Sequence, residues 1–255
     1  MKNSILLSSR DLLALLNKIL LIDIETLPAL GWFWNLYETN IIATVQDWRL
    51  LSFSAKWLGG EQETYIDHKT DRLLLKKIWK LLDEAEIVIA HNGDSFDIKK
   101  INARFLFWGM TPPSPYRTID TLKISRRYFG LLSHKQDDIG KYLGTGRKIK
   151  TDKDLWLDCI RGDKKALKQM AHYNAQDVVL LEKNYLRYRP WIKNHVNLDN
   201  YSEQTVCPKC QSTKLVRRGY QFNQTTKYAR IQCKDCKGWS RSPVNINEKR
   251  SLSNL

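Results

Sequence analysis

Two acidic residues close an aliphatic run near the start of the chain, where Asp23 and Glu25 follow Leu20, Leu21 and Ile22. A short apolar run of this kind predicts a buried strand. Alternate residues along a strand point to one face, so the two carboxylates would lie side by side and repel each other. A divalent cation relieves such repulsion, and Mg²⁺ prefers carboxylate oxygen, water and substrate phosphate as ligands. Two solvated acids where a strand meets a loop would give the same pattern, so the choice depends on other residues.

A third acid, Asp97, follows the apolar run 87–90 and begins a predicted helix at 97–107. The amino terminus of a helix carries a partial positive charge, which favours a carboxylate at this position. Taken alone, Asp97 is better explained as a plain helix cap than as part of a site.

A tyrosine and a fourth acid, Tyr173 and Asp177, lie four residues apart in a long helix predicted at 163–188. Residues at positions i and i+4 share a helix face, so a phenol and a carboxylate would point to the same place. His172, five residues before Asp177, would lie well round the helix from it. Taken alone, Tyr173 and Asp177 are better explained as a surface pair.

Four of the five cysteines form two Cys-x-x-Cys pairs with 22 residues between them: Cys207, Cys210, Cys233 and Cys236. Two such pairs around a strand-like insert predict a zinc ribbon, in which four thiolates hold one structural Zn²⁺ in a tetrahedral site. A redox pair is the alternative. Few cysteines in this arrangement favour a reducing compartment with a metal site over disulfides. Cys159 lies apart on a predicted helix, and we expect a structural role for it.

The charge of the chain is strongly positive: its 255 residues include 42 Lys and Arg against 27 Asp and Glu, a formal net charge of +15. This excess indicates a polyanionic partner, most simply nucleic acid. Solubility alone, or an anionic membrane surface, are the alternatives. No apolar run is long enough to suggest a transmembrane helix. Arg10, Asp11 and Lys18 interrupt the apolar amino-terminal segment, which argues against a signal peptide, and we expect a cytoplasmic protein.

Two predicted loops carry residues suited to nucleic acid. The first, 30–37, follows the acidic pair and contains Trp32 and Trp34, which either belong to the core or form a platform on which a terminal base stacks. The second, 144–150, combines two glycines with Arg147 and Lys148, and would let a phosphate backbone approach. No Gly-Lys-Ser/Thr sequence follows, so a solvated loop is the simpler explanation of the second.

The pattern of predicted elements indicates an α/β fold. A short helix is predicted at 9–18, and strands are predicted at 41–46, 50–57 and 63–66. Antiparallel strands followed by alternating strands and helices predict a mixed sheet flanked by helices. The proposed division is a large domain at 1–193, a linker at 194–204, the zinc ribbon at 205–245 and a polar tail at 246–255.

The carboxy-terminal segment 196–255 is basic, with 11 Lys and Arg against 4 Asp and Glu, and aromatic residues are interleaved among them: Tyr220, Phe222, Tyr228 and Trp239. Basic strands with exposed rings suit single-stranded nucleic acid. Alternatively, the rings form the small core of the ribbon and the charge serves solubility. We expect the ribbon to hold substrate or to dock on a replication or recombination protein.

Taken together, the acidic clusters resemble a known family. Asp23-x-Glu25, the segment Asn92 to Asp97 and the Tyr173-xxx-Asp177 spacing occur in the order of the three motifs of the DEDD superfamily of 3′–5′ exonucleases. That superfamily has a ribonuclease H-like fold, and its tyrosine variant also occurs in the proofreading domains of family B DNA polymerases. The resemblance covers about residues 18–190 and includes a strand-to-helix step at 117–122. The whole chain looks most like the stand-alone exonucleases of tailed phages.

The resemblance implies a role for each motif residue. The ligands of two divalent ions, Mg²⁺ or Mn²⁺, would be Asp23, Glu25, Asp97 and Asp177. Tyr173 would orient the attacking water, while Asn92 and Phe96 would contact the terminal nucleotide or support Asp97. His172 fits the spacing of the superfamily's histidine branch, but that branch usually has a small residue where this chain has Asn174, so the tyrosine branch fits better.

The resemblance also implies an activity. We expect a metal-dependent 3′–5′ exonuclease that hydrolyses single-stranded DNA by a two-metal-ion mechanism and releases mononucleotides. A ribonuclease or a structure-specific endonuclease on the same site is one alternative, and a catalytically silent nucleic-acid-binding adaptor is another. The expected location is the cytoplasm, which would be that of the host if the protein is encoded by a phage.

Overall fold

The computed structural model describes residues 18–35, 37, 40–247 and 252–253. Nearly all of the helix predicted at 9–18 therefore lies outside the described residues. The chain divides into two compact units, a larger one at Asn17–Asn184 and a smaller one that contains Tyr185–Leu255. The division falls inside the longest helix, α7 (Lys164–Tyr188).

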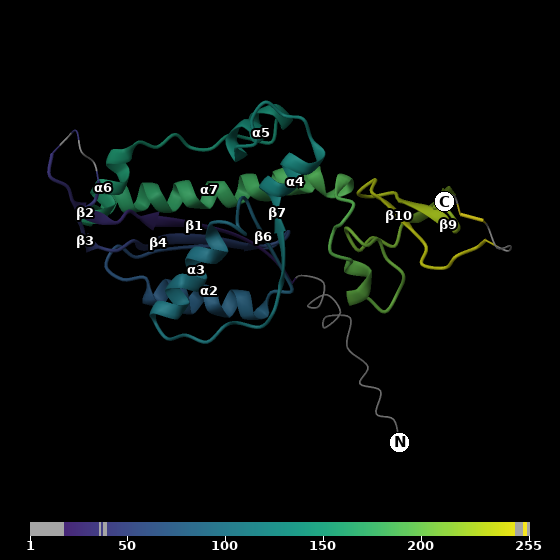
Figure 1. Cartoon of the computed structure of the whole chain (residues 1–255), viewed down its shortest axis with the longest axis horizontal. Helices are drawn as coiled ribbons and strands as arrows, with labels where there is room; N and C mark the ends of the chain where they lie inside the picture. Colours follow the sequence, from purple (N-terminus) through teal and green to yellow (C-terminus); the bar gives the residue numbers. More distant parts are fainter. Residues whose placement is uncertain (1–17, 36, 38–39, 248–251, 254–255) are drawn as a thin grey trace, which may run out of the picture. The chain divides into compact units, whose positions relative to one another are not determined.

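A five-stranded mixed sheet forms the centre of the larger unit (Figure 1). Its order is β5 (Gln62–Ile66), β4 (Arg49–Trp57), β1 (Ile19–Leu27), β6 (Ile87–Ala90) and β7 (Arg117–Asp120). Strand β4 pairs antiparallel with β1 and β5, whereas β1, β6 and β7 run parallel. The prediction of a mixed sheet flanked by helices is confirmed.

The two faces of β1 carry different side chains. Asp23 pairs with Ser54 and Glu25 pairs with Ser52 in the antiparallel register with β4. Since directly paired residues share a face, this face of the sheet is polar at its centre. Ile22 and Ile24 point to the opposite face and are buried.

Helices α2 (Arg72–Glu84) and α3 (Asp97–Phe107) cover the aliphatic face, below the sheet in Figure 1. The apolar residues of α2 recur with helical spacing, so one side of this helix is buried against the sheet. The resulting core includes Leu20, Ile22, Ile24, Phe53, Leu75, Ile78, Leu82, Val88, Ile101 and Phe105.

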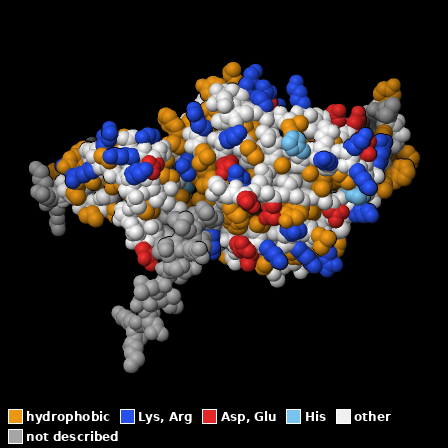
Figure 2. Space-filling view, turned by 180° about the vertical axis from the view of Figure 1, so that it is seen from behind, with side chains coloured by type: hydrophobic (Ala, Val, Ile, Leu, Met, Phe, Trp, Pro, Cys, Tyr) orange, Lys and Arg blue, Asp and Glu red, His pale blue; other side chains and the backbone are white. Residues whose placement is uncertain are grey.

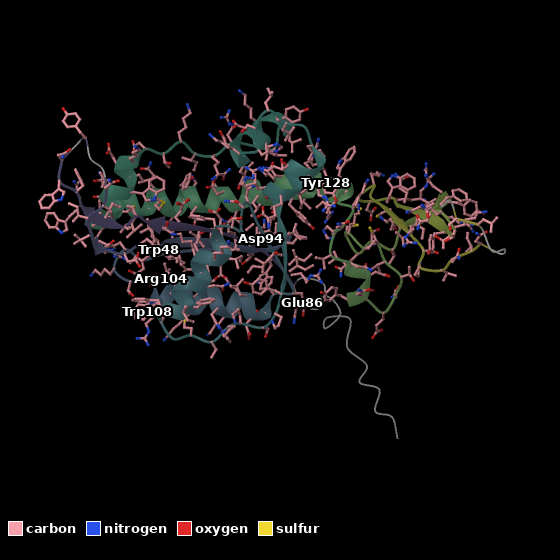
Figure 3. All side chains as sticks on the ribbon, viewed as in Figure 1. Trp48, Glu86, Asp94, Arg104, Trp108 and Tyr128 are labelled. Carbon is pink, nitrogen blue, oxygen red and sulfur yellow. The ribbon has the colours of Figure 1, made fainter. Side chains whose placement is uncertain are left out.

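A buried ion pair ties these helices to the sheet. Arg104 Nε lies 2.6 Å from Asp71 Oδ2, and Arg104 Nη2 donates to Asp71 Oδ1 at 3.0 Å. Trp108 Nε1 donates to the same Oδ1, and the amide of Leu50 donates to Oδ2. Figure 3 labels Arg104, Trp108 and the nearby Trp48. Removing one partner of such a pair costs about 3–5 kcal/mol because the other charge stays buried.

Helix α7 crosses the polar face of the sheet, above it in Figure 1. Gln62 Nε2 donates to the carbonyl of Ala175 at 2.7 Å, and Lys56 Nζ lies 2.6 Å from Glu182 Oε2. These contacts fix the rotation and the sliding position of α7 on β4 and β5.

Three shorter helices lie on the same side of the sheet as α7: α4 (Thr121–Tyr128), α5 (Gln136–Leu143) and α6 (Lys153–Arg161). Cys159 of α6 is buried with Leu27, Leu51, Leu155 and Met170, as expected for a structural residue.

The aromatic segment after the acidic pair is not wholly a loop. Residues Leu30–Trp32 form β2, which pairs with β3 (Ala43–Gln46) in a separate two-stranded sheet. Trp32 is 67% exposed and Trp34 is 82% exposed, so the alternative that these rings are simply core is wrong. Hydrophobic side chains gather at this end of the unit in Figure 2.

The smaller unit contains a three-stranded antiparallel sheet. Its elements are the short 3₁₀ turns η1 (Arg189–Trp191) and η2 (Leu198–Tyr201) and the strands β8 (Leu215–Phe222), β9 (Lys227–Cys233) and β10 (Trp239–Arg241). The buried Lys209 donates through Nζ to the carbonyl of Pro190 at 2.6 Å, which ties the first cysteine pair to the segment after α7. Across the described ranges of the whole chain, no helix has the length and apolar content needed to span a membrane.

Candidate functional site

Three carboxylates from two distant segments converge on the polar face of the sheet. Asp23 and Glu25 come from β1 and Asp177 comes from α7, and each offers an oxygen within 4.8 Å of the others. Asp177 is fully buried, while the side chains of Asp23 and Glu25 are half-buried. Like charges repel strongly at this separation, so the acids are stabilised either by protonation or by a cation.

Asp97, at the first turn of α3, lies beside this cluster but outside the group of three. It is buried, and its Oδ1 accepts a hydrogen bond from the amide of Ile24 at 3.1 Å. That bond joins the start of α3 to the centre of β1 between the two acids. The charge of Asp97 is also near enough to raise the pKa of Asp23.

The acids favour their protonated forms in the absence of a cation. Burial raises the pKa of Glu25 to about 8 and that of Asp97 to about 7. Burial, followed by the charge of Asp97, raises the pKa of Asp23 well above its usual range, and burial raises that of Asp177. The cluster therefore carries a desolvation and repulsion cost that a divalent cation would remove.

A lysine already offsets part of this charge. Lys148 Nζ lies 2.6 Å from Asp177 Oδ2 and 3.4 Å from the hydroxyl of Tyr173. Its neighbour Arg147 turns the other way and forms a bidentate pair with Asp137, at 2.8 and 2.6 Å. Asp137 also accepts the amide of Lys148, so one carboxylate fixes the loop with Lys148 directed at the acids. Of the two basic residues predicted to bind substrate, the structure brings only Lys148 to the cluster.

The hydroxyl of Tyr173 also lies beside Lys148, which in turn contacts Asp177. The ring packs edge-on against Trp156, with centroids 6.3 Å apart and planes at 71°. Burial raises the pKa of Tyr173, so the phenol is neutral at ordinary pH. His172 is exposed and does not enter the cluster.

Asn174 is a residue of the cluster that sequence reasoning missed. It is fully buried, and its Nδ2 donates to Asp23 Oδ2 at 2.7 Å. Its Oδ1 accepts from Ser52 Oγ at 3.2 Å. Asn174 precedes Asp177 by three residues, so the two share a helix face, and that spacing is the available signal.

The loop after β6 holds the two remaining motif residues. Asn92 has a positive φ of 68°, and its amide donates to Asp120 Oδ1 at 3.0 Å. Asp120, at the end of β7, also caps α4, so it joins this loop to that helix. Phe96 is 39% exposed at the start of α3. The structure gives the side chain of Asn92 no direct contact with the acids among the hydrogen bonds of the described residues.

The donor set fits a hard divalent cation. Asp177 is buried with Lys148 Nζ 2.6 Å from its Oδ2, and its two oxygens keep lone pairs for a further ligand. Carboxylate oxygens with free lone pairs are the ligands that Mg²⁺ and Mn²⁺ prefer.

Comparison with known proteins identifies the larger unit. Residues 53–187, more than half of the chain, match the family RNase_H_2, described as RNase_H superfamily. The chain belongs to the RNase H superfamily. Over 156 residues it is 31% identical to a DNA polymerase III PolC-type from Ureaplasma parvum serovar 3, which covers 61% of this chain and 9% of that relative. The chain thus spans less than a tenth of the length of this relative.

A solved structure has the same fold. The family B DNA polymerase from the hyperthermophilic archaeon Pyrobaculum calidifontis matches with a TM-score of 0.53 and 12% identity, over 81% of this chain and 31% of that one. At this identity the likeness concerns the fold alone.

The second cluster, of four cysteines, has the geometry of a metal site. The Sγ atoms of Cys207 and Cys236 are 3.7 Å apart, as are those of Cys210 and Cys233. Zn–S bonds of about 2.3 Å in a tetrahedron place sulfurs about 3.8 Å apart. A disulfide would need about 2.05 Å. All four sulfurs lie within 4.8 Å of one another, so the residues fit a four-thiolate metal ion rather than a redox pair.

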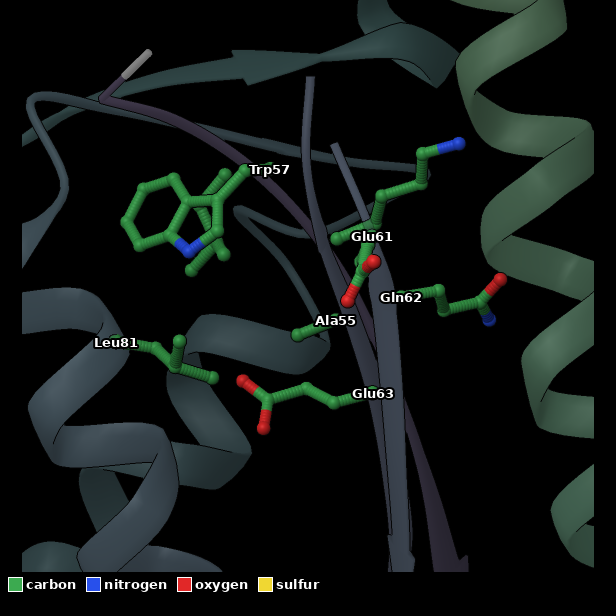
Figure 4. A pocket seen from close by; sticks show the side chains of 8 residues that line it. Ala55, Trp57, Glu61, Gln62, Glu63 and Leu81 are labelled. Carbon is green, nitrogen blue, oxygen red and sulfur yellow. The ribbon is translucent and has the colours of Figure 1, made fainter. Parts of the chain in front are cut away.

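Two pockets of the RNase H domain lie outside these clusters. One, of about 460 Å³, is lined by Thr26, Pro28, Lys153, Trp156 and Leu157, and Trp156 also packs against Tyr173. The other, of about 230 Å³, contains Trp57, Glu63 and Leu81 (Figure 4). Ala55 in its wall pairs with Ile22, so this pocket opens on the sheet face opposite the acids.

Proposed function

We propose that the chain is a metal-dependent 3′–5′ exonuclease that hydrolyses single-stranded DNA and releases mononucleotides. The observation that carries this proposal is the convergence of Asp23, Glu25 and Asp177 within 4.8 Å in a domain of the RNase H superfamily. The PolC-type relative is a DNA polymerase, which favours DNA over RNA as the substrate. The 3′–5′ direction rests on the order of the three motifs.

The four acids would hold two divalent ions, Mg²⁺ or Mn²⁺, and the raised pKa values of Glu25 and Asp97 support this role. When bound, such ions lower the pKa of water and stabilise the charge that develops on phosphodiester oxygens. The protein's part is to hold the acids in place. Asn174 fixes Asp23 by a hydrogen bond, and the amide of Ile24 fixes Asp97.

Tyr173 and Lys148 are the groups that would act on water and phosphate. The neutral phenol can accept or donate a hydrogen bond and so orient the attacking water toward the phosphorus. Lys148 supplies a fixed positive charge beside it, 3.4 Å from the hydroxyl, which would favour an anionic phosphate in the site. The exposure of His172 supports the assignment of this chain to the tyrosine branch.

The four cysteines would hold one Zn²⁺, since the sulfur separations match a tetrahedral site. All four positions are filled by thiolates, so this ion would stabilise the ribbon and leave no open position for chemistry. Metal analysis of the purified chain should find about one zinc ion per molecule, and replacement of Cys207 and Cys236 by Ser should abolish it.

A time course on a 5′-labelled linear oligonucleotide tests the activity. With added Mg²⁺ or Mn²⁺ we expect a ladder that shortens from the 3′ end, no shortening without added ion, and none with Asp23→Ala. Circular dichroism would establish that the variant is folded. Cleavage of circular single-stranded DNA would favour an endonuclease instead, and cleavage of RNA alone a ribonuclease. Tight binding without any cleavage would favour a silent adaptor.

A further inference from the structure

The rings of the carboxy-terminal sheet are on its surface and do not form a core. Tyr220 is 39% exposed, Phe222 is 68% exposed and Trp239 is 44% exposed. A ribbon whose rings formed its core would bury them, so the alternative that Tyr220, Phe222 and Trp239 form the core is wrong. Exposed rings that lie together, with cations beside them, are typical of a binding surface.

A bulge in β8 places one arginine and two rings on one face. Arg217 pairs with Ile231, and Tyr220 pairs with Ala229. An advance of three residues along β8 therefore corresponds to an advance of two residues along β9. Gly219 has a φ of 73°, which a glycine adopts without strain, and it absorbs the extra residue. Without this bulge, Arg217 and Tyr220 would point to opposite faces.

Lys227 completes this face from β9, because it pairs with Phe222. Its Nζ lies 4.1 Å from the ring centroid of Tyr220 and 5.8 Å from that of Phe222. The guanidinium of Arg217 lies 5.0 Å from the Tyr220 centroid on the same face. We call these four residues, Arg217, Tyr220, Phe222 and Lys227, the ring face.

The charged side chains on the strands around the ring face are all basic. Strands β8, β9 and β10 contain no acidic residue, and neither Arg217 nor Lys227 forms an ion pair with a described carboxylate. Figure 2 shows many Lys and Arg side chains and few Asp and Glu on the surface of this unit. An anionic partner with flat apolar groups matches this surface, and nucleic acid has both properties.

The opposite face of the same sheet also has cations that lie over rings. The guanidinium of Arg241 lies 3.9 Å from the centroid of Tyr228. Arg230 donates through Nε to the carbonyl of Arg218 at 2.9 Å and lies over Trp239. The ring face differs in its exposure, since Phe222 is 68% exposed whereas Tyr228 is half-buried, and its cations make no such hydrogen bond to a strand carbonyl among the hydrogen bonds of the described residues.

We infer that the ring face binds two successive nucleotides of single-stranded nucleic acid, which is the substrate class of the proposed nuclease and so rests on that proposal. One base stacks on Tyr220 and the next on Phe222, while Arg217 and Lys227 contact the phosphates. The two ring centroids are 6.3 Å apart, with planes at 53°. Bases in a duplex repeat about every 3.4 Å along each strand, so the rings accommodate unstacked bases and not a duplex.

The test is a binding titration on the full-length Asp23→Asn chain, which cannot cleave if the proposed nuclease exists. Fluorescein-labelled oligothymidylate and oligouridylate of about 20 nucleotides serve as probes, and anisotropy is measured at several salt concentrations. We expect Tyr220→Ala and Phe222→Ala each to weaken binding about fivefold or more. Arg217→Gln and Lys227→Gln should each reduce the slope of log K against log salt by about one.

A matched control on the opposite face is Tyr228→Ala combined with Trp239→Ala, which should change affinity less than twofold. Zinc content and circular dichroism identify any variant that fails to fold, and the two glutamine variants keep the rings in place. Equal losses of oligonucleotide affinity for variants on both faces would overturn the assignment. Unchanged binding by all ring-face variants would also overturn it. Loss of binding to phosphatidylserine vesicles without loss for either oligonucleotide would also overturn it. Because the parent for this test is already inactive, failure of the proposed nuclease leaves the binding result independent.

Discussion

The two candidate metal clusters of this chain differ in donor atoms, in assembly and in what they leave open for chemistry. The acidic cluster has hard oxygen ligands from β1 and α7, segments about 150 residues apart. The cysteine cluster has four soft sulfur ligands from two short knuckles. Four thiolates complete a tetrahedron, whereas carboxylates with free lone pairs leave positions for water and phosphate. This difference supports the proposal that the first cluster is catalytic and that the second stabilises the structure.

The largest effect is expected from the cysteine cluster. Cys233→Ser removes one of the four proposed zinc ligands, and structural zinc contributes about 10–16 kcal/mol to folding of small domains. The ribbon should lose zinc and become open to proteases between β8 and β10. Metal analysis and limited proteolysis measure both. Retention of zinc, with the ribbon still protected, would contradict the four-thiolate assignment.

The next largest effect is expected from Asp177→Asn. The substitution keeps the shape of the side chain and removes a buried carboxylate that would hold a metal ion. Metal ions supply several kcal/mol of transition-state stabilisation, at about 1.4 kcal/mol per tenfold in rate, so cleavage should fall at least about 10³-fold. Asp158→Asn, on the surface of α6 and paired only with Arg161 among the ion pairs of the described residues, is the matched control and should be neutral.

A smaller effect is expected from Tyr173→Phe, and His172→Ala provides a closely matched control for it. Tyr173→Phe keeps the ring against Trp156 and removes only the hydroxyl near Lys148, and it should lower kcat about 10²-fold. His172→Ala, one residue away and exposed, should change kcat less than twofold. A larger loss with His172→Ala than with Tyr173→Phe would move the chain to the histidine branch.

Asn174→Ala tests the support of the acidic cluster. The variant removes the hydrogen bond at 2.7 Å to Asp23 and leaves all four acids in the chain. Mutation of a group that orients a metal ligand typically lowers metal affinity or activity by about 10–100-fold. We expect the concentration of Mn²⁺ needed for half-maximal cleavage to rise within that range. An unchanged metal requirement would show that Asp23 needs no such support.

The smallest expected effect is the change in thermal stability of the metal-free protein with pH. Glu25, with a pKa near 8, and Asp97, with a pKa near 7, favour protonation in the folded metal-free chain. A raised folded-state pKa contributes stability at low pH that is lost as pH rises through that value. Metal-free protein should therefore lose a few degrees of Tm between pH 5 and 8 from these groups. The gain in Tm on adding Mg²⁺ should grow over the same interval, and an equal gain at both pH values would contradict the account.

The sequence was sufficient for the main features of the RNase H domain. Period-two alternation in β1 puts Asp23 and Glu25 on one face, and helical spacing in α7 does the same for Tyr173 and Asp177. These patterns are local, so they can be recognised without knowing the fold. The cysteine spacing is equally local, and the sulfur separations agree with it.

Contacts between distant segments could not be predicted from the sequence. Arg147 and Lys148 are adjacent and both basic, yet Asp137 holds one outward while the other reaches Asp177. Nothing in the two residue types distinguishes them. Asn174 meets Asp23 across 151 positions, and only the crossing of α7 over β1 creates that contact. The exposure of Trp32 and Trp34 likewise depends on the β2–β3 hairpin, which forms a sheet of its own.

Direct titration of Mn²⁺ into the zinc-loaded full chain, followed by electron paramagnetic resonance, tests the central claim that the carboxylates form a separate divalent-ion site. We expect about two bound Mn²⁺ ions per chain, as a two-metal site requires. Asp177→Asn should lose this binding while Asp158→Asn keeps it. Undiminished Mn²⁺ binding by Asp177→Asn, or no binding by the parent chain, would contradict this claim.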